Sequence, residues 1–209
     1  LKLIEDWLRA NRLSLSLKKT KYMLFGKERD TDALPLVLPT LTIGQGNIKR
    51  TSSTPFLGVI LDENLTWNNH ISLVELKIAK NIGAIAKARR YVTPVAARSL
   101  YVSFVHPYIS YGNIVWASTY KSKLSRIFTL QKRGVRIISH AARLSHSRPL
   151  MVQHKLLNVF ELNIHQTLTF VFKHQHNMLP IVFQPYLKQI GHRYKSRLSK
   201  FGYVQKRLT

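Results

Sequence analysis

The 209-residue sequence contains no cysteine and few acidic residues. The lack of cysteine excludes disulfides, cysteine-bearing zinc sites and thiol catalysis, and it fits a reducing compartment. Nine Asp and Glu stand against 33 Lys and Arg, which gives a net charge of +24 and a pI of about 10.7. So large an excess of one sign destabilises a compact state unless a partner of opposite charge neutralises it.

Long apolar runs are also missing. The most apolar stretch, residues 95–117, is interrupted by Arg98, His106, Pro107 and Asn113, so no segment reaches the about 20 apolar residues of a membrane span. The first eight residues form an amphipathic pattern without a signal-peptide cleavage region. We therefore expect a nuclear or cytoplasmic protein that is not secreted and has no membrane partner.

The residues that are present suit a folded, polyanion-binding protein. A hydrophobic fraction of 45% is enough for a packed core. Nucleic acid is the commonest partner of a strongly basic fold. An anionic membrane surface or a ribosome-associated role is the next alternative.

Hydrophobic periodicity divides the chain into a mixed first part and a helical second part. We expect a helix at residues 1–13, then strands at 21–25, 36–43, 47–51 and 56–61. Residues 56–61 read as a strand or a hairpin that leads into the helical part. The helices expected there are residues 71–91, 94–105, 121–140, 149–158 and 161–177, with a short one after Pro180 and a basic tail at 192–206. This order predicts an α+β fold.

Two of the expected helices have a basic side opposite an apolar side. In residues 71–91 the apolar side is formed by Ile71, Val74, Ile78, Ile82 and Ile85, and the basic side by Lys77, Lys80, Lys87 and Arg90. In residues 121–140 the apolar side is formed by Leu124, Ile127, Phe128, Val135 and Ile138, and the basic side by Arg126, Lys132, Arg133 and Arg136. Such basic sides either follow the phosphates of a duplex or are simply solvated.

Other candidate side chains have two interpretations. The aromatic residues Tyr108, Tyr111 and Trp116 either stack on bases or belong to the core. His174 and His176 are two apart, so they point in different directions on a helix and do not suggest a metal site.

The acidic residues do not form a complete catalytic metal site. Nucleotidyl transfer uses two divalent metals held by neighbouring carboxylates. Glu5 and Asp6 are adjacent on a helix, so their side chains diverge by about 100°. Two other pairs lie in a polar loop and in a turn, at Asp30 and Asp32 and at Asp62 and Glu63. The sequence therefore predicts no metal bound by this chain and no independent catalytic centre.

Six ordered segments resemble reverse transcriptases of non-LTR (LINE-like) retrotransposons. Residues 7–13, Trp-Leu-Arg-Ala-Asn-Arg-Leu, are similar to the helix that follows the family's Tyr-x-Asp-Asp hairpin. Residues 15–20 are similar to its Leu-Asn-x-x-Lys-Thr segment, with Ser16 in place of the usual Asn. Residues 56–71 resemble its junction of palm and thumb. Residues 100–101 resemble the family's thumb helix, and the Pro, Tyr-Gly and Trp within residues 107–116 resemble the loop that follows it. Residues 130–136 resemble the family's Leu-Gln-Lys-Arg-Ala-x-Arg segment.

The resemblance implies an N-terminal helix with a small antiparallel sheet (the end of the palm), an all-α thumb and C-terminal helices, divided at residues 1–62, 63–140 and 141–209. The catalytic aspartates would precede residue 1. Together with the absence of an initiator methionine, this leads us to expect a fragment of an RNA-directed DNA polymerase, inactive alone, whose partners are an RNA–DNA or DNA duplex and the missing N-terminal part. Mg²⁺ is expected only for the complete enzyme.

The resemblance also implies roles for individual residues. Lys19 matches a lysine near the incoming triphosphate, proposed to act as a general acid toward the pyrophosphate leaving group. Phe56, Leu57 and Gly58 match a hairpin that supports the 3′ end of the primer. The alternative function is a non-catalytic, basic nucleic-acid-binding module unrelated to polymerases.

Overall fold

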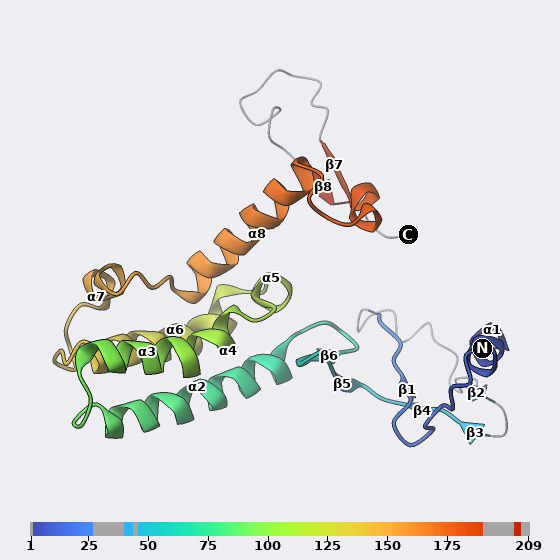
Figure 1. The fold of residues 1–209 in the computed structure, drawn as a ribbon, viewed down its shortest axis with the longest axis horizontal. Coiled ribbons are helices and arrows are strands. Elements are labelled where there is room, and N and C mark those ends of the chain that lie inside the picture. Colours follow the sequence, from blue (N-terminus) through green and yellow to red (C-terminus); the bar gives the residue numbers. More distant parts are fainter. Residues whose placement is uncertain (1, 27–39, 44–45, 190–202, 206–209) are drawn as a thin grey trace.

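A computed structural model describes the chain except for residues 1, 27–39, 44–45, 190–202 and 206–209. The fold is α+β, as the sequence predicts. Helix α1 and short strands lie at one end, a β-hairpin follows, and the rest is helical except for one short strand pair near the C-terminus (Figure 1). No helix in the described part is long and apolar enough to cross a membrane. The predicted basic tail falls almost wholly outside the described residues.

The N-terminal part consists of one helix and two separate strand pairs. Helix α1 spans Lys2–Ala10. Strand β1 (Lys21–Tyr22) pairs in parallel with β4 (Lys49–Arg50), and β2 (Thr42–Ile43) pairs antiparallel with β3 (Gly46–Asn47). The small sheet is therefore divided into pairs, one of them parallel. Ile48 is the one buried residue among the described positions of 2–62, so little core supports longer strands.

A hairpin at residues 53–62 connects this part to the helices. Strands β5 (Ser53–Phe56) and β6 (Val59–Asp62) pair antiparallel, with Phe56 opposite Val59. Leu57 and Gly58 form the turn with φ of 47° and 81°, the left-handed values of a tight hairpin turn. A continuous strand over 56–61 is therefore wrong, and the hairpin alternative is confirmed.

Five helices begin and end within a few residues of the predicted limits, except that α7 ends at Gln153, whereas the short helices α4 and α5 were not predicted. In chain order the helices are α2 (Asn68–Ala88), α3 (Pro94–Phe104), α4 (His106–Ser110), α5 (Asn113–Trp116), α6 (Lys121–Ile138), α7 (Ser147–Gln153) and α8 (Val159–Gln175). A 3-10 helix, η2 (Ile181–Tyr186), precedes strands β7 (Leu187–Gln189) and β8 (Tyr203–Gln205), which pair antiparallel. Pro94 occupies the first turn of α3, and Pro107 the first turn of α4, where a missing N–H costs nothing.

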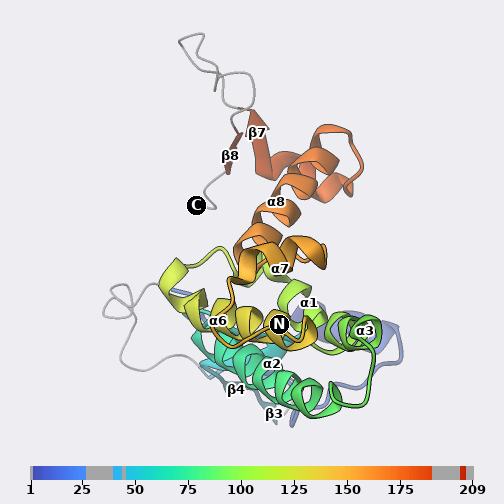
Figure 2. The same cartoon turned by 90° about the vertical axis from the view of Figure 1, so that its left-hand side faces the viewer.

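The hydrophobic core lies between α2, α3 and α6. The four isoleucines and Val74 on the predicted apolar side of α2 are all buried, and so are Leu124, Ile127, Val135 and Ile138 of α6, whereas Phe128 is half-buried. Tyr101 of α3 passes close over Gly134 of α6, where a Cβ atom would come within 2.8 Å of the ring. Figures 1 and 2 both show α2 and α6 side by side along most of their length.

Helix α8 packs on this core with its first half and then rises away from it (Figures 1 and 2). Val159 and Leu162 belong to the same hydrophobic cluster as α2 and α6. Gln166 accepts a hydrogen bond from the Ile114 N–H (3.1 Å) and donates one to the Ser110 carbonyl (2.7 Å). These polar contacts hold the helix against α4 and α5.

Candidate nucleic-acid interface

The first candidate surface is the α2 cationic face, which we define as Lys77, Lys80, Lys87 and Arg90. All four side chains are exposed, and none forms a hydrogen bond or ion pair with another described residue. Arg90 lies two residues beyond the end of α2 at Ala88, in the following turn. Lys80 and Lys87 lie two turns apart on the same side of the helix. These charges repel one another until anions bind beside them.

The basic residues of α6 are mostly engaged within the chain. Arg126 pairs with Glu75 of α2 at 3.5 Å, Lys132 lies 4.6 Å from the centre of the Phe128 ring, and the Arg136 guanidinium donates to the Ser145 carbonyl at 2.7 Å. Arg133 is exposed and has no such partner among the described residues. The two helices that looked equivalent in sequence therefore differ in how many free cations they present.

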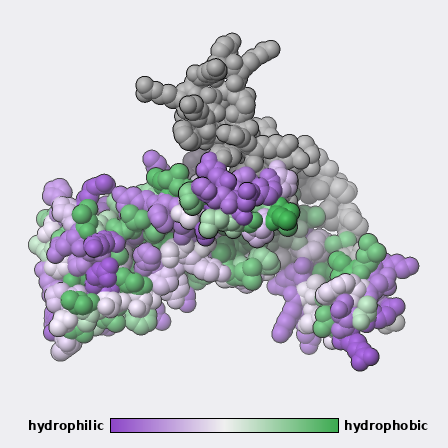
Figure 3. Space-filling model, turned by 45° about the horizontal axis from the view of Figure 1, so that its top comes forward, coloured by the Kyte–Doolittle hydropathy of each residue, from purple (hydrophilic) through white to green (hydrophobic). Residues whose placement is uncertain are grey.

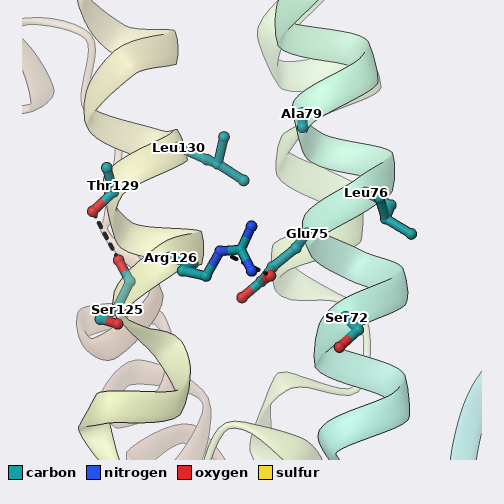
Figure 4. A pocket seen from close by; sticks show the side chains of 8 residues that line it. All are labelled: Ser72, Glu75, Leu76, Ala79, Ser125, Arg126, Thr129 and Leu130. Atoms are coloured by element: carbon teal, nitrogen blue, oxygen red, sulfur yellow. Dashed lines mark hydrogen bonds and ion pairs between the residues drawn. The ribbon is translucent and has the colours of Figure 1, made fainter.

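A groove of about 430 Å³ runs between α2 and α6 (Figure 4). The Glu75–Arg126 pair lies inside it, between side chains of the two helices. Glu75 is the only acid of α2, and its side chain is 12% exposed, while Arg126 is 83% exposed. An ion pair with one partner this exposed contributes little stability. The lining residues are Ser72, Glu75, Leu76, Ala79, Ser125, Arg126, Thr129 and Leu130.

Hydrophilic and hydrophobic side chains are interspersed over the helical part of the surface seen in Figure 3. On that face neither kind gathers into one continuous patch.

The hairpin tip is the second candidate surface. Phe56 and Leu57 are 59% and 74% exposed, and Gly58 is exposed between the strands. The Tyr111 hydroxyl donates a hydrogen bond of 2.6 Å to the Leu57 carbonyl. The tip thus presents two apolar side chains to solvent while its backbone contacts the segment between α4 and α5.

The turn after the hairpin is organised by Asp62. One carboxylate oxygen accepts from the Thr66 N–H and the other from the Trp67 N–H, both at 2.8 Å. Leu65 and Trp67 take positive φ values of 51° and 63°, and these two bonds hold the turn that leads into α2. Asp62 therefore has a structural role.

Lys19 lies apart from the helical surfaces. It is exposed in the turn before β1, where its backbone N–H donates to the Ser16 carbonyl at 3.0 Å. The α2 and α6 cations belong to the other end of the molecule (Figure 1). In the described part of the chain, no group of three or more His, Asp or Glu side chains is arranged to hold a metal. The described residues therefore do not fit Mg²⁺.

Two aromatic candidates are exposed and one is buried. Tyr108 and Tyr111 are 39% and 58% exposed, whereas Trp116 is 0% exposed and its indole N–H donates to the Tyr111 carbonyl at 2.9 Å. The interpretation that Trp116 stacks on bases is therefore wrong, and Trp116 belongs to the core. His174 is buried and His176 packs on Phe172.

Burial lowers the pKa of His70, His106 and His154, most directly by removing solvent from the imidazole, with Arg98 adding to the effect at His154. His70 is buried, its Nδ1 accepts from the Ile60 N–H at 3.3 Å, and its ring meets the edge of Trp116. It is therefore a neutral link between the hairpin, α2 and α5.

Sequence reasoning missed Tyr111 and Gln131 as organising residues. Gln131 is 2% exposed; its oxygen accepts from the Val159 N–H at 2.8 Å and its amide donates to the Leu157 carbonyl at 3.4 Å. A signal was present, because position 131 lies on the apolar side of α6 between Ile127 and Val135. No comparable signal marks the Tyr111 contact, which joins residues 54 positions apart.

The chain is similar to two proteins of Drosophila melanogaster. It is 22% identical over 166 residues to the probable RNA-directed DNA polymerase from transposon X-element, covering 78% of this chain and 18% of that protein. It is 28% identical over 95 residues to the probable RNA-directed DNA polymerase from transposon BS, covering 44% of this chain and 10% of that protein. No protein-family model and no solved structure matches. The chain thus spans less than a fifth of the length of either relative, and the two similarities support a relationship to RNA-directed DNA polymerases of transposons.

Proposed function

We propose that this chain is the template–primer-binding part of a non-LTR transposon RNA-directed DNA polymerase. The main support for this proposal is the α2 cationic face, where four exposed cations have no partner among the described residues. Unpaired cations along one helix attract phosphates and release the counterions of a duplex. The names of the two relatives support the polymerase assignment.

In this proposal residues 1–62 are the end of the palm, 63–140 the thumb, and 141–209 a helical extension. The α2 cationic face and Arg133 contact phosphates, and Phe56, Leu57 and Gly58 at the hairpin tip contact the primer. Arg126 also contacts a phosphate, which replaces Glu75 as its ionic partner. Lys132 and Arg136, which are engaged inside the chain, make smaller contributions. Lys19 acts near the triphosphate only in the complete polymerase, with Mg²⁺ held by carboxylates outside this chain.

The proposal is tested by the salt dependence of binding to an RNA–DNA hybrid duplex, followed by fluorescence anisotropy. The test variant combines Lys77→Gln, Lys80→Gln, Lys87→Gln and Arg90→Gln. If each side chain neutralises one phosphate, the slope of log affinity against log salt decreases by about 3 to 4, because each contact contributes about 0.9 on B-form DNA.

A matched control removes the same charge elsewhere. It combines Lys121→Gln, Arg143→Gln, Lys155→Gln and Lys173→Gln, again three lysines and one arginine, all exposed and without a side-chain partner among the described residues. We expect a distinctly smaller change in slope. Equal slopes for the two variants would remove the α2 cationic face from the interface, and absence of binding by the unmodified chain at low salt would overturn the proposed function. Nucleotide incorporation by the chain with Mg²⁺ would contradict the assignment of catalysis to missing carboxylates.

A further inference from the structure

The hairpin tip rests on a pair of residues between α4 and α5. The Leu57 carbonyl at the tip accepts a hydrogen bond of 2.6 Å from the Tyr111 hydroxyl. The tip also approaches so closely that a Cβ atom on Gly58 would lie 3.3 Å from the Tyr111 ring. On the other side, a Cβ atom on Gly112 would lie 3.2 Å from Val59. Gly58 and Gly112 also have positive φ values of 81° and 60°. Glycine at both positions therefore allows the hairpin backbone and the segment between α4 and α5 to approach this closely.

A second set of contacts joins the same hairpin to α2 and α5. The Ile60 N–H donates to Nδ1 of His70 in α2 at 3.3 Å, and the His70 and Trp116 ring centres are 5.4 Å apart. The Trp116 indole N–H then donates to the Tyr111 carbonyl at 2.9 Å. The contacts form a closed ring that runs from the hairpin through Tyr111, Trp116 and His70 and back to the hairpin.

The other end of the hairpin is bonded to the N-terminal part. The Glu63 carboxylate pairs with Arg50 at 3.0 Å, its N–H donates to the Ser52 carbonyl, and its carbonyl accepts from the Gly26 N–H at 3.3 Å. Among the described residues, the hydrogen bonds that leave residues 2–52 end at Ser53 or Glu63. The hairpin is thus the hydrogen-bonded bridge between the two parts (Figure 1), and Tyr111 holds its free tip.

We infer that Tyr111 is a positioning residue: its hydroxyl holds the hairpin tip to the helices, so that Phe56 and Leu57 keep a constant position relative to the α2 cationic face. An isolated two-stranded hairpin is marginally stable in water, and the two exposed apolar side chains of the tip provide no packing of their own. The hydrogen bond to the Leu57 carbonyl holds the tip itself, whereas the His70 contact holds the hairpin further along, at Ile60. That this surface receives a nucleic-acid strand rests on the proposed function; the positioning itself does not.

The absence of cysteine in the chain allows two labels to be placed without interference. Phe56→Cys marks the exposed tip and Ala84→Cys an exposed position of α2. Nitroxide labels at both sites report the tip-to-helix distance distribution by pulsed electron paramagnetic resonance. We expect a narrow distribution for the labelled chain and a broad one after Tyr111→Phe, which removes only the hydroxyl. Tyr108→Phe is the matched control, because the Tyr108 hydroxyl has no hydrogen bond with a described residue, and it should leave the distribution narrow.

Two further measurements complete the test: amide hydrogen exchange of residues 57–60 and binding to a duplex. Both use unlabelled chains in which Phe56 is not replaced. Loss of one hydrogen bond should raise tip opening, and hence exchange, by about 2- to 10-fold. Affinity for a hybrid duplex with a recessed 3′ end should fall while the salt slope stays unchanged, because Tyr111→Phe removes no cation. A distribution as narrow in Tyr111→Phe as in Tyr108→Phe would overturn the inference. If the unmodified chain binds no duplex, the proposed function fails, and the distance measurement still decides the positioning role.

Discussion

Replacing Gln131 by leucine tests how strongly one buried polar side chain holds the C-terminal helices to α6. Gln131 is 2% exposed, and its oxygen is the acceptor for the N–H of Val159, itself 0% exposed. Leucine has similar volume but leaves this N–H, and the Leu157 carbonyl, without their partner. A buried donor without an acceptor costs about 1–3 kcal/mol, whereas the shape of the core is preserved.

The expected loss in free energy of unfolding for Gln131→Leu is therefore about 2 kcal/mol. In a chain of this size it lowers the unfolding midpoint temperature by about 4–8 °C. Urea and thermal unfolding of the full chain, followed by far-ultraviolet circular dichroism, measure both quantities.

The same substitution elsewhere serves as the control. Gln153 is exposed at the end of α7 and its side chain has no hydrogen bond with a described residue, so Gln153→Leu should stay within about 0.5 kcal/mol of the unmodified chain. If Gln131→Leu is equally mild, the Val159 N–H has another acceptor or water reaches it, and the role given to Gln131 is wrong.

Two further predictions concern pH and helix capping. Burial lowers the pKa of His70, His106 and His154 below the usual 6.5. As the pH falls through 6.5, these histidines therefore become protonated in the unfolded chain before they do in the folded chain. The stability that these neutral imidazoles provide is complete above pH 6.5 and is lost as the pH falls toward their folded values. The urea midpoint should then be lower at about pH 5.5 than at about pH 7.5; an equal or higher midpoint would contradict this. Asn158→Ala removes the side chain that accepts from the N–H groups of Phe160 and Glu161 in a capping box. We expect a loss of about 1 kcal/mol by urea unfolding, and no loss would show that α8 begins independently of this cap.

The helices and their inner faces could be predicted from sequence because both depend on local spacing. Isoleucine or valine at every third or fourth position of α2, from Ile71 to Ile85, defines one side of a helix whatever the rest of the chain does, and all five residues are buried. The strands were predicted less well. Residues 56–61 contain a turn at Leu57 and Gly58, which the apolar pattern alone did not distinguish from a continuous strand, and the short pairs of the N-terminal part have only Ile48 as a buried residue among the described positions.

Sequence by itself determined the charge of this protein, its α+β order of elements and the sides on which its basic residues lie. Tertiary structure decided which of those basic residues are free. Arg126 meets Glu75 from 51 positions away and Tyr111 reaches Leu57 across 54, whereas the cations of α2 find no partner among the described residues. The reason is physical: helix periodicity is set by neighbours along the chain, but the partner of a charge or a hydroxyl is set by which surfaces the fold brings together.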